Sequence, residues 1–156
     1  MRKQKGFSLI ELLIVVAIIL IIAAIAIPNL LRSRIAANES SAVGSMRSVN
    51  TAQVTYASTY PQVGFADDLK KLGPYTGTNP DSTAAGLLDA VLGCPSQPCN
   101  KSGYQFNISI GGPVYDSHGN PITTGQSGQR SFYSDASGVI RFNQTATATA
   151  TDAPLQ

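Results

Sequence analysis

The hydrophobic pattern of this 156-residue chain starts with one long apolar run. Between Phe7 and Leu31 the residues are almost all apolar, and Glu11 is the only charged side chain among them. About 20 apolar residues span the hydrocarbon core of a bilayer, so Leu12–Leu31 alone is long enough. We therefore expect residues 7–34 to form a membrane-spanning helix with its flanking turns.

From residue 35 the apolar positions narrow to a single stripe, spaced three and four residues apart over most of its length. This spacing is typical of a helix with one buried face. The stripe consists of Ile35, Ala42, Met46, Val49, Gln53, Tyr56 and Tyr60. We expect one continuous helix from about Phe7 to about Tyr60, about 80 Å long at 1.5 Å per residue. Its second half, residues 35–60, should pack on a globular head.

After a connecting region, residues 61–103, the pattern changes to that of strands. Tyr104–Ile110 alternates strictly between apolar and polar residues, which predicts a half-buried strand. Ser131–Ser134 and Val139–Phe142 flank Asp135–Gly138, a good hairpin loop. The predicted core residues of the sheet are Tyr104, Phe106, Ile108, Phe132, Val139 and Phe142. The fold class is therefore α+β, a long N-terminal helix on a three- or four-stranded antiparallel sheet over residues 104–143.

Four other segments carry weaker signals. Short helices are expected at Ala66–Leu72 and Thr83–Leu92 in the connecting region. Asp116–Pro121 has turn composition, so we expect His118 on a surface turn. The Thr/Ala-rich residues 144–156 should form a flexible tail or an extended edge.

Pro28 interrupts the apolar half of the predicted helix. Proline lacks a backbone donor and frees the carbonyl of Ala24, so a helix kink or a loosened turn is expected there. The simpler alternative is a mildly bent membrane helix.

Cysteine and histidine are too few for metal or catalytic chemistry. Cys94 and Cys99 are the only cysteines and follow a membrane segment, so a disulfide in an oxidising compartment is predicted, with two free thiols as the alternative. A metal site needs three or four ligands, and His118 is the only histidine. We expect no metal, no cofactor and no enzymatic activity.

Charge is concentrated at the start of the chain. Arg2, Lys3 and Lys5 precede the apolar run, which favours a cytoplasmic N-terminus, although Arg32 and Arg34 follow it. The full chain has a formal net charge of +2. Loss of residues 1–6 would remove three basic residues and leave eight basic against nine acidic, a net charge of −1. No basic face remains that would indicate specific nucleic-acid binding.

The basic start and the apolar run are joined by the sequence Lys5-Gly6-Phe7-Ser8-Leu9-Ile10-Glu11-Leu12-Leu13. It closely resembles the class III signal of type IV pilins and type II secretion pseudopilins. The resemblance implies that a prepilin peptidase removes residues 1–6 by cutting between Gly6 and Phe7 and methylates the new amine of Phe7. It also implies that Glu11 pairs with that amine during assembly.

Two other interpretations of this segment are open. An ordinary secretory signal would be cut after Ala24-Ile25-Ala26, but its apolar core would be unusually long and would contain Glu11. A plain uncleaved anchor would leave Glu11 at the cytoplasmic interface. The mass of the mature chain separates these readings, because only the pilin-type signal predicts a start at Phe7.

The resemblance also implies a function. The chain would be stored in the bacterial inner membrane and then assembled into a homo-oligomeric filament, on the cell surface as a pilus or in the periplasm as a pseudopilus. Its partners would be the peptidase, an inner-membrane assembly platform and minor pilins. Adhesion or twitching motility is the first expectation, a type II secretion pseudopilin the alternative, and an anchored envelope binding module the second alternative.

Overall fold

The computed structural model describes residues 6–111 and 114–155, so residues 1–5 of the predicted leader lie outside the described residues. The chain forms two compact units, Met1–Arg34 and Ile35–Gln156. One helix, α1 (Leu9–Thr59), has residues in both units. Each unit is described by itself below.

In the first unit, α1 is the element that carries the apolar run. It is helical on both sides of Pro28, so the predicted kink is not a break in the helix and stays a prediction. The apolar side chains are exposed along this stretch, with Phe7 at 77% and Leu30 at 71% exposure. The described residues of the first unit, 6–34, therefore form no core of their own.

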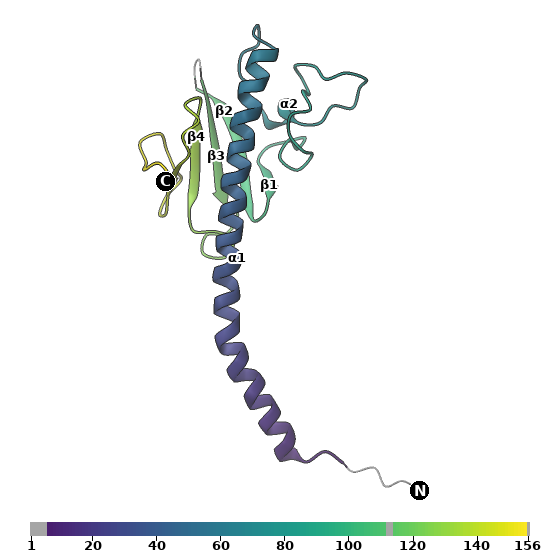
Figure 1. Cartoon of the computed structure of the whole chain (residues 1–156), viewed down its shortest axis with the longest axis vertical. Coiled ribbons are helices and arrows are strands. Elements are labelled where there is room, and N and C mark those ends of the chain that lie inside the picture. The colour runs from purple at the N-terminus through teal and green to yellow at the C-terminus, as the bar shows by residue number, and fades with distance from the viewer. Residues whose placement is uncertain (1–5, 112–113, 156) are drawn as a thin grey trace. The chain divides into compact units, whose positions relative to one another are not determined.

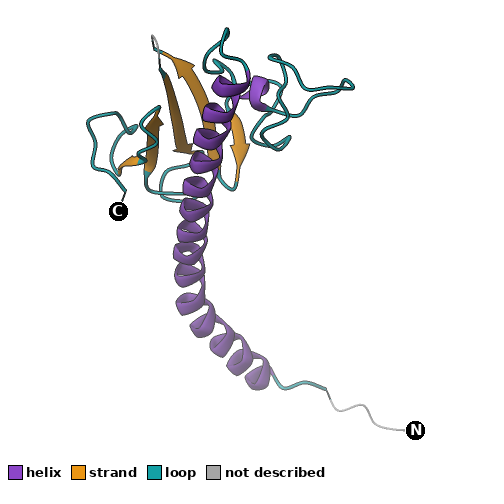
Figure 2. Cartoon of the chain, turned by 45° about the horizontal axis from the view of Figure 1, so that its top comes forward, coloured by secondary structure: helices purple, strands orange, loops and turns teal. Residues whose placement is uncertain are grey.

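In the second unit, the remainder of α1 lies across the sheet, as Figures 1 and 2 show from two directions. The central positions of the predicted stripe are buried, and Ile35 and Tyr60 at its ends are half-buried. The buried residues of α1 are Glu39, Ala42, Ser45, Met46, Val49, Asn50, Ala52, Gln53 and Tyr56. The period read from the sequence therefore places the helix correctly on the head.

The sheet is an antiparallel meander of five strands in the order β1-β2-β3-β4-β5, one strand more than the upper prediction. The strands are β1 (Cys99–Lys101), β2 (Tyr104–Ile110), β3 (Tyr115–Pro121), β4 (Ser131–Asp135) and β5 (Arg141–Asn143). The predicted strand Tyr104–Ile110 is confirmed residue for residue. β1 was not predicted, because three residues are too few to show alternation.

Strand β3 corrects the predicted turn at Asp116–Pro121. Its residues alternate between buried and half-buried, and it pairs with β2 along its whole length. Close packing explains why a glycine, Gly119, occupies its position in this strand. A Cβ there would lie 3.0 Å from the Phe106 ring and 3.4 Å from the Met46 sulfur. Glycine in a strand often marks such a close approach, which turn composition alone does not reveal. His118 is therefore a half-buried strand residue and not a turn residue.

The core between α1 and the sheet contains most of the predicted residues. Tyr104, Phe106, Ile108 and Phe132 are buried, and Phe142 is half-buried and packs against them. The prediction for Val139 was wrong. It is 38% exposed, and its neighbour Ile140 is buried instead, a one-residue shift that exchanges the two faces of an extended chain.

The connecting region contains one short helix, α2 (Leu69–Leu72), inside the predicted Ala66–Leu72. The helix predicted at Thr83–Leu92 is wrong, because the segment consists of turns and bends. Its backbone N–H groups at residues 85–88 donate to carbonyls of Lys71, Leu72 and Gly73. These contacts with a distant segment replace the i→i−4 bonds of a helix.

The tail after β5 forms an extended edge at its end. The N–H of Phe142 donates to Ala153 and that of Leu155 donates to Ile140, which brings Arg141 opposite Pro154. Ala148, in the same tail, is fully buried. In Figure 1 this tail and the connecting region lie at opposite edges of the sheet.

Candidate functional site

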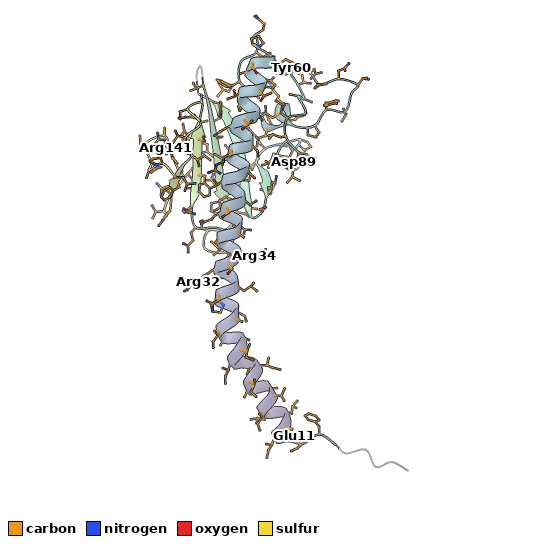
Figure 3. The ribbon with its side chains drawn as sticks, viewed as in Figure 1. Glu11, Arg32, Arg34, Tyr60, Asp89 and Arg141 are labelled. Atoms are coloured by element: carbon orange, nitrogen blue, oxygen red, sulfur yellow. A yellow bond between two sulfur atoms is a disulfide. The ribbon has the colours of Figure 1, made fainter. Side chains whose placement is uncertain are left out.

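Glu11 lies in the first turn of α1, at the start of the apolar run (Figure 3). Its carboxylate accepts a hydrogen bond of 2.9 Å from the backbone N–H of Ser8, the residue before the helix. This is the glutamate half of a capping box, in which the third helical residue satisfies the N–H of the capping residue. The negative charge also lies at the positive end of the helix dipole. Glu11 is therefore aimed back toward the segment in which the predicted cleavage lies.

Gly6 and Phe7 precede the helix in a segment without regular secondary structure. Phe7 is 77% exposed, and a Cβ on Gly6 would meet no atom within 4 Å. The peptide bond between them is thus open to an approaching enzyme. An amine on Phe7 would lie one residue from the N–H that Glu11 already binds.

The apolar half of α1 presents its side chains outward on every side. By length and composition α1 is able to cross a membrane, and none of its most apolar 18-residue window is buried within the chain. An exposed apolar surface of this size indicates a lipid or protein contact. Arg32 and Arg34 mark its C-terminal end (Figure 3).

Cys94 and Cys99 form the predicted disulfide, with their Cα atoms 5.6 Å apart. The loop they close contains Gln97, whose side-chain amide donates to the carbonyl of Ile108 and accepts from its N–H. Gln97 thereby pairs with β2 just beyond the last residue paired to β1. The disulfide loop thus extends and covers this edge of the sheet.

A second glutamate of α1, Glu39, was missed by sequence reasoning. It is 7% exposed and accepts hydrogen bonds from the N–H groups of Gln129 and Arg130 and from Nε of Arg130, at 2.8–3.1 Å. The Arg130 guanidinium also lies over the rings of Phe132 and Phe142. This ion pair fastens the loop before β4 to α1.

The described residues, 6–111 and 114–155, contain no group of three or more His, Cys, Asp and Glu placed to hold a metal ion. His118 lies on the sheet face opposite α1, with its ring 5.3 Å from that of Tyr133. We take Glu11, the exposed apolar residues of α1 and the segment before them as the candidate site.

The comparisons with known proteins point to the same segment. The family described as the prokaryotic N-terminal methylation motif matches residues 1–27, which include Gly6, Phe7 and Glu11. Over this N-terminal segment, the chain is similar to type IV pilins. The remainder of the chain has the expected α+β arrangement of a long helix on an antiparallel sheet.

Two curated proteins resemble this chain over part of its length. The type IV wide pilus major component PilA4 of Thermus thermophilus is 67% identical over 39 residues, which cover 25% of this chain and 30% of that protein. The type IV major pilin protein PilA of Myxococcus xanthus is 40% identical over 73 residues, which cover 42% of this chain and 33% of that protein. Each match thus spans about a third of the relative's length. No solved structure matches the chain.

Proposed function

We propose that this protein is a pilin, a structural subunit of a type IV pilus-like filament, and not an enzyme. The observation that carries the proposal is the exposed apolar half of α1, most of which lies within the methylation motif at residues 1–27. Both relatives are named as major components of type IV pili. The helix would be held by lipid before assembly and by other copies of itself afterwards.

Processing would create the second partner of Glu11. A prepilin peptidase cutting between Gly6 and Phe7 would leave a methylated amine on Phe7, four residues before Glu11 in the segment that leads into α1. The hydrogen bond between Ser8 N–H and Glu11 supports this, because the carboxylate already turns back toward that end. In the filament the amine of one subunit would meet Glu11 of the next.

Such a pair would fix the register between subunits. In an apolar bundle an isolated charge is costly, and a paired one is held strongly. Copies shifted by a helical turn would bury both charges unpaired. The contact joins two different surfaces, the Phe7 amine of one subunit and Glu11 of the next. When such a contact repeats without closing into a ring, it generates an open helical filament.

The filament would be a surface pilus that serves adhesion or twitching motility. Its assembly would require the peptidase, an inner-membrane platform and minor pilins, with the N-terminus starting on the cytoplasmic side. The names of the relatives favour this over the alternative, a periplasmic pseudopilus of type II secretion.

Electron microscopy of sheared surface fractions, with mass determination of the subunit, tests the proposal. We expect fibres whose subunit begins with methylated phenylalanine at position 7. A subunit that keeps residues 1–6 would make it an anchored envelope protein instead. The pseudopilus would be supported if the parent strain carries no surface fibres and a strain lacking the gene fails to export proteins.

The charge of Glu11 is tested separately from its capping hydrogen bond. Glu11→Ala removes both, whereas Glu11→Gln keeps an oxygen that can accept from Ser8 N–H and removes only the charge. We expect both variants to insert in the membrane and be processed, and both to give few or no filaments. A normal filament yield from Glu11→Gln would show that the charge has no role in assembly.

A further inference from the structure

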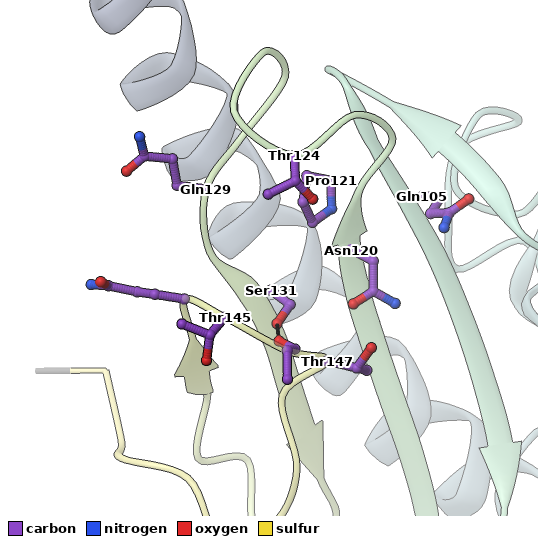
Figure 4. Close-up of a pocket in the computed structure, with 10 residues that line it drawn as sticks. Gln105, Asn120, Pro121, Thr124, Gln129, Ser131, Thr145 and Thr147 are labelled. Carbon is purple, nitrogen blue, oxygen red and sulfur yellow. Dashed lines mark hydrogen bonds between the residues drawn. The ribbon is translucent and has the colours of Figure 1, made fainter.

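A hollow of about 310 Å³ lies on the face of the sheet that is turned away from α1. The side chains of Gln105 on β2 and Asn120 on β3 lie on this face, because their neighbours Tyr104 and Gly119 are buried on the α1 side. The two residues are opposite each other in the strand register. Figure 4 shows them beside the loop after β3, the start of β4 and the tail.

The lining of this hollow is polar but carries no charge. Its residues are Gln105, Asn120, Pro121, Thr124, Gln129, Ser131, Gln144, Thr145, Ala146 and Thr147. Within the described part of the chain, hydrogen bonds occupy the side chains of Ser131 and Thr145 only. The four side-chain amides are thus free to bind something else, and each offers both donors and an acceptor.

The wall formed by the tail is held in place by the fold. The Asn143 carboxamide oxygen accepts from the N–H groups of Thr145 and Ala146, and its nitrogen donates to Asp152. The Ser131 hydroxyl binds the carbonyls of Asn143 and Ala146. A wall fixed in this way loses little freedom when a ligand binds.

We propose that this hollow binds a neutral saccharide. Sugar hydroxyls both donate and accept hydrogen bonds, and side-chain amides and threonine hydroxyls match them in both directions. A charged ligand would find no countercharge in this lining, so it would gain no ion pair there. The volume is at the lower end of the range for ligand pockets, so it suits one or two sugar rings. The site lies wholly in the head and does not depend on the proposed filament.

Nuclear magnetic resonance of the ¹⁵N-labelled full chain in dodecylphosphocholine micelles tests the proposal, because this detergent carries no sugar. The probes are the methyl glycosides of glucose, galactose, mannose and N-acetylglucosamine, together with maltose and lactose. Glucuronate and glucosamine are their charged counterparts. We expect at least one neutral probe to shift the side-chain amide signals of Gln105 and Asn120 saturably, and the charged ones to bind more weakly.

The double variant Gln105→Ala, Asn120→Ala should weaken that binding about tenfold, since it removes two hydrogen-bonding groups. Both residues are on the solvent side of the sheet, so the backbone spectrum should be preserved. Gln126→Ala is the matched control, because this glutamine is exposed in the same loop as Thr124 but does not line the hollow. Absence of shifts with every neutral probe, preference for a charged probe, or unchanged binding by the double variant would each overturn the proposal.

Discussion

At the scale of single residues, two glutamates of α1 both accept hydrogen bonds from backbone N–H groups but are suited to different roles. Glu11 accepts one backbone N–H and is exposed, so its charge is available to a partner outside the chain. Glu39 accepts from two backbone N–H groups and from Arg130, and it is buried. Its acceptors are all used within the head. The first is therefore suited to assembly and the second to holding the head together.

His118 gives the head a dependence on pH. Its Nδ1 atom is buried and has no hydrogen-bond partner among the described residues. Burial lowers the pKa of His118 below its ordinary value of 6.5, and the nearby carboxylate of Asp116 opposes this shift in part. The neutral ring is therefore the form that fits between β3, Tyr133 and the tail.

Because the unfolded chain binds this proton at a higher pH than the folded head, acid should weaken the head. The free energy of unfolding should fall as the pH drops from about 7 to about 5, by about 1.4 kcal/mol for each unit of lowered pKa. Urea unfolding of the full chain in detergent, followed by tyrosine circular dichroism, measures this. His118→Gln should flatten the profile over that range. An equal slope in the variant would assign the effect to other groups.

At the scale of elements, the hydrophobic pattern predicted the elements whose burial repeats regularly along the chain. The apolar stripe of α1 and the alternation of β2 each mark the buried face of one element, and both are confirmed. β3 and the segment Thr83–Leu92 were misassigned because their structure depends on distant partners, namely β2 and the carbonyls that follow Lys70. The Glu39–Arg130 pair joins residues 91 positions apart, and no local signal connects them. Gly6, Phe7 and Glu11 could be proposed as site residues from the sequence because their motif is contiguous, and the match of the methylation motif includes all three.

Alanine substitutions at two glycines distinguish the effect of core packing from that of backbone entropy on the stability of the head. Gly119→Ala would place a Cβ 3.0 Å from the Phe106 ring in the core, so we expect a loss of about 1–3 kcal/mol in the free energy of unfolding. Gly44→Ala adds a methyl group in open space on an exposed turn of α1, and should raise that free energy by about 0.5–1 kcal/mol. Chemical unfolding of both variants in one detergent checks the opposite signs. If Gly119→Ala is neutral, the sheet and α1 are packed more loosely than described.

At the scale of the whole molecule, the two units need opposite surroundings. Ile35–Gln156 has its own core, with residues such as Tyr56, Tyr104 and Phe132 fully buried. The apolar residues of Met1–Arg34 that the structure describes are exposed and require an apolar partner. Lipid and other copies of α1 both supply an apolar partner. Transfer of the helix from lipid to other copies therefore needs no change in the head. The different needs of the two units follow from their amino-acid compositions, which can be read from the sequence.

The same division predicts how the filament should come apart. If apolar packing of α1 holds the subunits, a detergent that covers this helix should release folded monomers. Molar salt should leave the filament intact, because salt screens exposed charges but strengthens or preserves apolar burial. Sedimentation after each treatment, with circular dichroism of the supernatant, measures both effects. Glu11 would be protected from salt because its pair is buried in the bundle. Filaments that dissolve in salt and resist detergent would instead be held by charged contacts between the heads.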